Sequence, residues 1–400
     1  NDLQFDQRMR RICGTLSNAG YDVTLIGRRP ISPSSPLTQT PYTQVQLAGL
    51  IFTKGKLFYL EFNLRLLLFL LFKPCDAICS IDLDTAIPGI IATKIKSKPH
   101  LFDAHELFTH TPEVVRRKPI QKIWESVQKF TFSHTQAAIT VGPAIAQYFE
   151  EKYKIPVAVV RNMPVKTALK EKQSETSNLP PNNNLPEPNE ENALEANPSK
   201  ITNLPDESLP AWQSKIDAIQ GQQFILYQGA LNEARGLEIL IQAMTKIQGT
   251  LVLAGEGDLS QTLRNLTRSL NLDHKVIFLG MIPPNELPQL TKQAYIGYNV
   301  SQNAGLSYYL SLNNKFFDYT KALLPSLINP FPEYLTLMKE FQVGLPTEPT
   351  VDDVVKQANQ LLTNSTLYND IKSNCKKASE KWIWENETPT LIRVFRDVLN

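Results

Sequence analysis

Between residues 224 and 329 the chain alternates short apolar runs with helical patterns, and this rhythm constrains its fold more than any other feature. The runs FILYQ, TLVLA, KVIFLG and YIGYNV each end at a glycine or a polar turn, and most lead into a helical segment. Strands that alternate with helices in this way form a parallel sheet with helices on both faces. Because ligands bind beyond the carboxyl ends of such strands, the polar residues after these runs locate a candidate site.

The first part of the chain follows the same logic. We expect strands at YDVTLIG, AICSI, HLFDA, AAITV and VAVV, with helices after the second and the fourth of these runs. A helix at residues 6–18 precedes the first of these strands. An α/β domain of this kind normally begins with a strand before that helix, so we expect the sequence to lack its first few residues.

The length of 400 residues is comfortable for two domains. From Lys166 to Pro210 the chain is rich in Pro, Asn, Glu and Ser and almost free of aromatic residues. Such a segment buries too little apolar surface to offset its ordering entropy, so we interpret it as a disordered insertion, with partner binding as the alternative. We expect an N-terminal domain at 1–165, the insertion at 166–212, a C-terminal domain at 213–380 and a final helix at 381–400.

Composition excludes some classes of protein. The net charge of +2 gives no basis for bulk electrostatic binding of nucleic acid. The four cysteines are scattered, and the spacing of Cys75 and Cys79 does not match a zinc knuckle, so we expect reduced packing residues in a cytoplasmic protein.

The most apolar stretch runs from Leu57 to Asp76. Its uncharged centre, Leu66 to Phe72, is far shorter than the ~20 residues that a transmembrane helix needs, and charged residues interrupt its flanks. We expect a helix buried against the sheet. The alternative is a monotopic helix at the bilayer surface, which would make the protein peripheral on the inner face of the membrane.

In the second half, the first site candidate is the turn from Gly229 to Gly236. Gly229 follows a strand, and Arg235-Gly236 precedes the helix GLEILIQAM. A helix N-terminus beside a guanidinium group suits a diphosphate, although a solvated surface arginine is the alternative. The next turn, which contains Glu256 and Gly257, also joins a strand to a helix, and a simple tight turn is the alternative there.

The third candidate is the helix that begins at Asn314-Lys315. Asparagine is a good N-cap residue, whereas a lysine in the first turn opposes the helix dipole, which prefers anions at that end. Such a lysine is understandable where an anionic ligand lies beside it. Asp318 lies one helical turn further on and suits a ribose diol, with a dipole-stabilising acid as the alternative.

The N-terminal half has its own polar cluster, because Asp103, His105 and Glu106 follow the strand HLFDA. These side chains suit a catalytic base, a sugar-binding histidine, a structural histidine or a metal site. A third metal ligand is not evident, so we expect no metal.

Taken in order, these segments resemble the GT-B glycosyltransferases of family 4, which are retaining enzymes that use nucleotide-sugar donors. The resemblance covers nearly the whole chain outside residues 166–210 and rests on NDLQFDQR, GYDVTLIGR, FDAHELF, ITVGPAIA, VVRNMP, YQGALNEARGLEILIQAM, LAGEGDL, FLGMIPPNELPQL, NNKFFDY and KWIWENE. It implies two Rossmann-like domains with parallel sheets that face each other across a cleft. The first domain would bind the acceptor, the second would bind the nucleotide-sugar, and the C-terminal helix would cross back to the first.

The resemblance also implies roles for the donor-side residues. Arg235 matches the basic residue on the donor diphosphate, and the helix start at Asn314-Lys315 matches the loop that meets the sugar and the diphosphate through backbone amides. Asp318 matches the second Glu of a paired-Glu motif, which binds the ribose, and Glu256-Gly257 lies near the nucleotide. In the first domain, the His105 cluster matches the position that contacts the transferred sugar.

Three positions depart from the family pattern. The usual Gly-Arg after the first donor-domain strand is Gly229-Ala230, the first Glu falls at Leu310, and the second is shortened to Asp318. Lys315 is the candidate replacement for the missing charge.

The sequence thus predicts a retaining, metal-independent glycosyltransferase without a bound cofactor. It would move a sugar from a nucleotide diphosphate to a saccharide or lipid-linked acceptor in cell-surface glycan synthesis. The departures leave open a non-catalytic nucleotide-sugar-binding or regulatory protein, and a nucleotide-sugar epimerase shares the architecture. No G-x-G-x-x-G opens either domain, which argues against a dinucleotide oxidoreductase.

Overall fold

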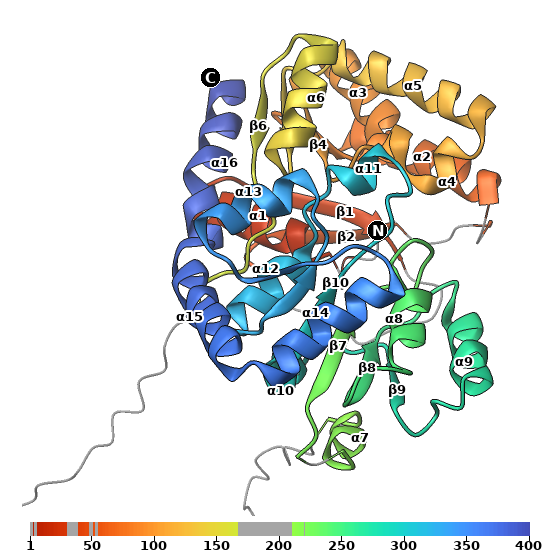
Figure 1. The fold of residues 1–400 in the computed structure, drawn as a ribbon. Helices are drawn as coiled ribbons and strands as arrows, with labels where there is room; N and C mark the ends of the chain where they lie inside the picture. The colour runs from red at the N-terminus through yellow and green to blue at the C-terminus, as the bar shows by residue number, and fades with distance from the viewer. Residues whose placement is uncertain are drawn as a thin grey trace, which may run out of the picture.

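The computed structural model describes residue 3 and residues 6–29, 39–47, 51–52, 55–166, 210–219 and 221–400. Residues 167–209 of the predicted insertion lie outside the described residues. The described chain forms two α/β halves, and every named strand in them pairs in parallel (Figure 1). We call residues up to 166 the N-terminal half and residues from 210 the C-terminal half.

The C-terminal half contains one six-stranded sheet. Its strands, in the spatial order β12-β11-β10-β7-β8-β9, are β7 (Phe224–Gln228), β8 (Thr250–Ala254), β9 (Val276–Gly280), β10 (Ile296–Asn299), β11 (Ser326–Ile328) and β12 (Gly344–Pro346). The strands β7, β8 and β10 are buried along their whole length, as expected of a parallel sheet covered on both faces. Because the chain leaves β7 toward β9 and returns beside β7 as β10, the topological switch point lies between β7 and β10.

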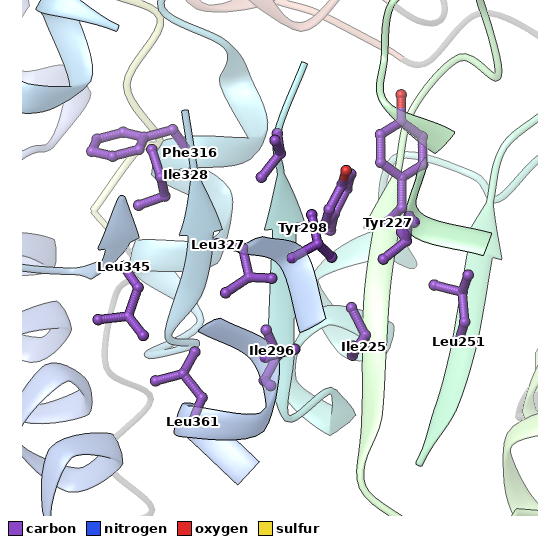
Figure 2. Close-up of a cluster of buried hydrophobic side chains, with 14 of the residues drawn as sticks. Ile225, Tyr227, Leu251, Ile296, Tyr298, Phe316, Leu327, Ile328, Leu345 and Leu361 are labelled. Atoms are coloured by element: carbon purple, nitrogen blue, oxygen red, sulfur yellow. The ribbon is translucent and has the colours of Figure 1, made fainter. Parts of the chain in front are cut away.

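Alternate side chains of these strands enter two separate cores. Ile225 and Tyr227 belong to the larger core, whereas Phe224 and Leu226 belong to the smaller one on the other face. Figure 2 shows the larger core, in which Ile225 and Tyr227 lie in a row with residues of β8, β10 and β11. The helices of this half are α7 (Gln213–Asp217), α8 (Leu237–Ala243), α9 (Ser260–Ser269), α10 (Leu287–Gln293), α11 (Leu306–Tyr309), α12 (Asn314–Lys321), α13 (Pro332–Glu340), α14 (Val351–Thr363) and α15 (Ser365–Lys381).

In the N-terminal half the parallel sheet is present in two parts. One part has the order β3-β4-β5-β6 and the other is the pair β1-β2. The strands are β1 (Thr24–Arg28), β2 (Thr43–Leu47), β3 (Ile78–Ile81), β4 (His100–Ala104), β5 (Ala137–Thr140) and β6 (Val157–Val159). The helices are α1 (Gln7–Asn18), α2 (Gly55–Phe72), α3 (Ala86–Lys96), α4 (Pro112–Val115), α5 (Lys118–Phe132) and α6 (Pro143–Tyr153), with 3-10 turns η1 (Leu83–Thr85) and η2 (Phe108–His110). A cavity of about 1210 Å³ is lined by residues of both β1 and β3.

The long apolar helix α2 is only half buried. Phe62, Leu66 and Leu70 form one face, which packs against Ile78 and Ala92. The opposite face is exposed, so the interpretation of this segment as a buried helix is wrong for that face. Within the part of the chain that the structure describes, no helix is both long enough and apolar enough to cross a membrane.

The four cysteines, all of which lie among the described residues, are free thiols. Burial raises the pKa of Cys13 and of Cys375 to about 12, so both stay protonated at neutral pH. Cys13 and Cys375 are therefore the reduced packing residues that the sequence predicts.

The last helix, α16 (Trp384–Leu399), packs on the N-terminal half and lies beside β6 (Figure 1). Leu391 and Phe395 join the apolar cluster that contains Met9 and Ile12 of α1. Closer to the start of the helix, the buried carboxylate of Glu387 accepts hydrogen bonds from Arg161, at 2.8 Å from its backbone nitrogen and 3.0 Å from Nε. Charge and apolar packing together hold the C-terminal helix in place.

We predict that Glu387→Ala lowers the free energy of unfolding by about 2 kcal/mol, because it removes charge-assisted hydrogen bonds to Arg161. Urea denaturation followed by circular dichroism measures this change. The matched control is Asp397→Ala on the same helix, which removes only an exposed ion pair with Arg396 and should change stability by less than about 0.5 kcal/mol. Equal effects of the two substitutions would contradict the role of Glu387.

Candidate functional site

A cavity of about 390 Å³ lies at the carboxyl end of the C-terminal sheet, between the two halves. Residues 227–230, which end and follow β7, form part of its wall, so the cavity lies at the topological switch point. Its volume is within the range of small-molecule sites. The polar side chains that line it belong to Arg8, His105, Glu106, Tyr227, Gln228, Arg235, Ser307, Tyr308, Ser311, Asn313, Asn314, Lys315 and Asp318.

Two cations in this cavity lie against aromatic rings instead of carboxylates. The Arg235 guanidinium carbon lies 4.5 Å from the centre of the Tyr308 ring, and Lys315 Nζ lies 4.6 Å from the centre of the Tyr227 ring. Among the described residues, neither cation forms a salt bridge. Burial, reinforced by Arg235, lowers the pKa of Lys315 well below its usual value. Aromatic rings, and not salt bridges, therefore hold these two basic side chains in the cavity.

A tight turn places Arg235. Both of its neighbours, Ala234 and Gly236, have left-handed backbone conformations, with φ of 60° and 66°. A Cβ atom at Gly236 would lie 2.6 Å from the carbonyl oxygen of Val300, so only glycine fits there. Left-handed conformations are costly for alanine, and such strain is concentrated at functional sites.

The start of α12 supplies the opposite wall. Lys315 is 9% exposed, and Asn314 Oδ1 accepts a hydrogen bond of 2.6 Å from Asn162 Nδ2 of the N-terminal half. Asp318 Oδ2 accepts a longer bond of 3.3 Å from Gln228 Nε2. Burial raises the pKa of Asp318 to about 6, although Arg11 of α1 opposes this shift. The structure thus brings Asn314, Lys315 and Asp318 into the same cavity as Arg235.

In the N-terminal half, Asp103 lies behind the cavity wall. Its fully buried carboxylate accepts hydrogen bonds from Arg8, at 3.1 Å from Nε and 2.8 Å from Nη2, and lies 3.1 Å from His105 Nε2. Arg8 and His105 line the cavity, whereas Asp103 does not. Although burial opposes its ionisation, Arg8 and His105 hold the pKa of Asp103 well below its usual range. Asp103 therefore positions two cavity residues.

His105 is held between two carboxylates. Its Nε2 contacts Asp103, and its Nδ1 lies 3.7 Å from Asp82 Oδ2. Burial opposes the charged imidazolium, but Asp103 and Asp82 raise the pKa of His105 to about 9. His105 therefore carries a proton on both ring nitrogens at neutral pH. Beside it, burial and Asp82 raise the pKa of Glu106 to about 7.

Three of the predicted donor-binding residues do not line the cavity. Gly236 shapes the turn at Arg235, and Glu256 forms a 3.1 Å ion pair with Arg264. A Cβ atom at Gly257 would lie 2.3 Å from Asn232 Oδ1, so this glycine is required by close packing of two loops. The glycine with positive φ in this turn is Gly255, at 149°, and not Gly257.

Sequence reasoning missed Arg8, Tyr227 and Tyr308. Arg8 had a usable signal, because it is a cation in the first turn of α1, the same pattern that singled out Lys315. Tyr227 and Tyr308 had no sequence signal, because their contacts with Lys315 and Arg235 form only in the folded chain.

Two of the three departures from the family pattern also have structural consequences. Leu310 packs against the apolar core of the N-terminal half and does not line the cavity. The carbonyl oxygen of Ala230 accepts a 2.8 Å hydrogen bond from the Tyr227 hydroxyl, which fixes the ring beneath Lys315.

Comparison with known proteins agrees with this architecture. The family model for glycosyl transferases group 1 matches residues 210–378, and the model for Glycosyltransferase Family 4 matches residues 7–163. An uncharacterized glycosyltransferase of Methanocaldococcus jannaschii is 27% identical over 198 residues, which are 46% of this chain and 49% of that protein. The chain spans about half, or less, of the length of the curated relatives it matches.

Solved structures show the same fold. Sucrose-phosphate synthase of Thermosynechococcus elongatus superposes with a TM-score of 0.71 at 14% identity, over 98% of this chain and 92% of that chain. The HepE protein of Anabaena, solved in complex with UDP-glucose, superposes with a TM-score of 0.59 at 14% identity, over 80% and 79% of the two chains. The predicted GT-B fold is confirmed. With one family model matching each half, the chain belongs to the family 4, or group 1, glycosyltransferases, a family of transferase enzymes with the GT-B fold.

Proposed function

We propose that this protein is an active glycosyltransferase that transfers a sugar from a nucleoside-diphosphate donor to a hydroxyl group of a saccharide or lipid-linked acceptor. The observation that carries the proposal is the pair of basic side chains, the half-buried Arg235 and the buried Lys315, which share one cavity and form no salt bridge among the described residues. Positive charge that is withdrawn from water without a salt-bridge partner is unfavourable, and a diphosphate between the two side chains would neutralise it. The UDP-glucose bound to the HepE protein is a ligand of this class.

The donor would lie across the switch point of the C-terminal sheet. Its diphosphate would meet Arg235, Lys315 and the first turn of α12, where backbone N–H groups also favour anions. Asp318, one turn along the same helix, would accept hydrogen bonds from the ribose hydroxyls. The transferred sugar would then point toward His105 and Glu106 of the N-terminal half.

The chemistry we propose is metal-independent and retains the anomeric configuration. The bond between the sugar carbon and the diphosphate oxygen breaks, a bond to the acceptor oxygen forms on the same face, and the acceptor proton passes to the departing phosphate oxygen. Charge on the leaving diphosphate would be stabilised by Arg235 and Lys315, which are fixed in place before the reaction. The imidazolium of His105 would donate a hydrogen bond to the sugar.

A second candidate function follows from Leu310. Because this position carries no charge and packs on the N-terminal half, a nucleotide-sugar-binding protein without turnover is the competing hypothesis. Incubating the protein with radiolabelled UDP-, GDP- and TDP-sugars, with and without acceptors, separates the two. Transfer or hydrolysis of any donor supports the enzyme. Donor binding without either reaction would support the competing hypothesis. A change of the sugar itself in acceptor-free buffer would indicate an epimerase.

We predict that Arg235→Ala weakens binding of the nucleoside diphosphate about tenfold or more, because a charge-assisted contact contributes about 1.5–3 kcal/mol. Isothermal titration calorimetry with UDP, GDP and TDP measures this change. Arg268→Ala, which removes an exposed arginine from α9, is the matched control and should bind as the unaltered protein does. If Arg235→Ala binds the nucleoside diphosphate with wild-type affinity, Arg235 does not contact the diphosphate.

We predict that the ring of Tyr308 matters for donor use, but its hydroxyl does not. Tyr308→Leu removes the aromatic face that holds Arg235 and should raise the donor KM about threefold to tenfold, since a cation–π contact contributes about 0.5–2 kcal/mol. Tyr308→Phe keeps the ring and should retain the donor KM. Steady-state kinetics with the donor identified above measures both variants. A defect of equal size in the two would show that the hydroxyl group is the important part.

We predict that protonation of His105 stabilises the fold at neutral pH. Its folded-state pKa of about 9 exceeds the unfolded value of 6.5, so the stabilisation is fully present below pH 6.5 and is lost as the pH rises through 9. The free energy of unfolding of the wild type relative to His105→Gln should fall by about 2–3 kcal/mol between pH 7 and pH 10. Urea titrations at both pH values measure it. A difference that does not change with pH would show that His105 is neutral throughout.

A further inference from the structure

The outer face of α2 is a continuous apolar stripe. Its five large side chains recur at intervals of three or four residues, so they lie on one side of the helix, and each is between 48 and 84% exposed. They are Leu57, Leu60, Leu64, Leu68 and Phe72. Since the opposite face is buried against β3 and α3, the helix is apolar all round, a pattern typical of helices buried on every side. An exposed apolar surface of this kind marks an interaction site.

Two neighbouring segments enlarge the stripe. The backbone nitrogens of Ile51 and Phe52 both donate hydrogen bonds to the carboxylate of Glu61, at 2.8–3.0 Å, which fixes these exposed apolar residues beside α2. The adjacent helix α3, which packs along α2, carries a further exposed apolar residue, Ile95, within one helical turn of Ala92, which contacts α2. We call the stripe together with these three residues the apolar face.

The charges around the apolar face are mostly positive. Glu61, the single acidic residue in the sequence of α2, is neutralised by Arg65 at 2.8 Å and by the two backbone N–H groups. Beyond the carboxyl end of α2 lie Lys73, Lys96 and Lys98, and Lys96 Nζ donates to the Lys73 carbonyl oxygen. The acid among them, Asp76, is paired with Lys98.

We propose that the apolar face of α2 docks on an anionic lipid bilayer, with its leucines in the acyl boundary and its lysines at the headgroups. Apolar side chains flanked by lysine are the combination that binds anionic membrane surfaces. A second copy of the chain fits less well, because its apolar face would bring only paired acids, Glu61 and Asp76, against these lysines. This surface goes beyond the proposed transferase activity, since bilayer contact needs neither donor nor acceptor.

The test is cosedimentation of the full chain with sucrose-loaded vesicles, without any nucleotide. We expect binding to phosphatidylglycerol–phosphatidylcholine vesicles that weakens at high salt, and weaker binding to pure phosphatidylcholine. Leu60→Ser combined with Leu64→Ser should reduce the partition coefficient at least tenfold, since each removes exposed apolar surface. Leu335→Ser, at a partly exposed leucine of α13 in the C-terminal half, is the matched control and should bind as wild type.

Two results would overturn the proposal. One is an absence of vesicle binding by the wild-type chain. The other is a dimer in solution, measured by light scattering, that the double substitution converts to a monomer, because the apolar face would then bind a second copy. Unchanged melting temperature and unchanged thermal shift with UDP in the double variant show that it is folded and keeps its donor site. Failure of membrane docking is thereby distinguished from failure of the proposed transferase activity.

Discussion

The buried ion pair between Arg8 and Asp103 holds the N-terminal wall of the site together. Arg8 also donates a 2.6 Å hydrogen bond to the Val160 carbonyl oxygen, so one guanidinium connects α1, the end of β4 and the segment after β6. Such a pair is costly to desolvate and becomes strongly destabilising if one partner is lost. Since the same carboxylate orients His105, the cavity depends on a contact that lies behind it.

Contacts between the halves complete the cavity. Asn162 bonds Asn314 at the start of α12, and Glu333 of α13 accepts a 2.5 Å hydrogen bond from the backbone nitrogen of Ala144 at the start of α6. The first contact joins the segment after β6 to the N-terminus of α12, and the second joins the N-termini of α6 and α13. Each half therefore contributes its own functional edge to one site, and the position of α12 is coupled to that of α1 through Arg11, which donates to Asn162.

Local sequence patterns predicted the helices, the strands and the donor-side residues of the site. They did not predict the residues that hold those side chains in place. Arg235 and Lys315 follow strand ends in a βα rhythm, so their place in the cavity could be read from the chain. Glu256 and Gly257 follow a strand end as well, but Glu256 pairs with Arg264, Gly257 packs against Asn232, and neither lines the cavity. The exposed face of α2 was not predicted as such, because uniform apolarity does not show which face a sheet covers. Arg8 carried the same first-turn signal as Lys315, but its pairing with Asp103 could not be predicted because the two residues lie 95 positions apart.

The arrangement of charge in the cavity supports the proposal that it binds a diphosphate although it differs from the family pattern. A carboxylate beside Arg235 or Lys315 would compete with an anionic ligand, whereas an aromatic ring holds a cation without neutralising it. Tyr227 and Tyr308 provide these rings, and the Tyr227 hydroxyl is itself fixed by Ala230, the position where a family arginine is absent. In the donor site that we propose, the second cation is Lys315 of α12, and the end of β7 orients it through Tyr227. Leu310 carries no charge and contributes apolar packing between the halves.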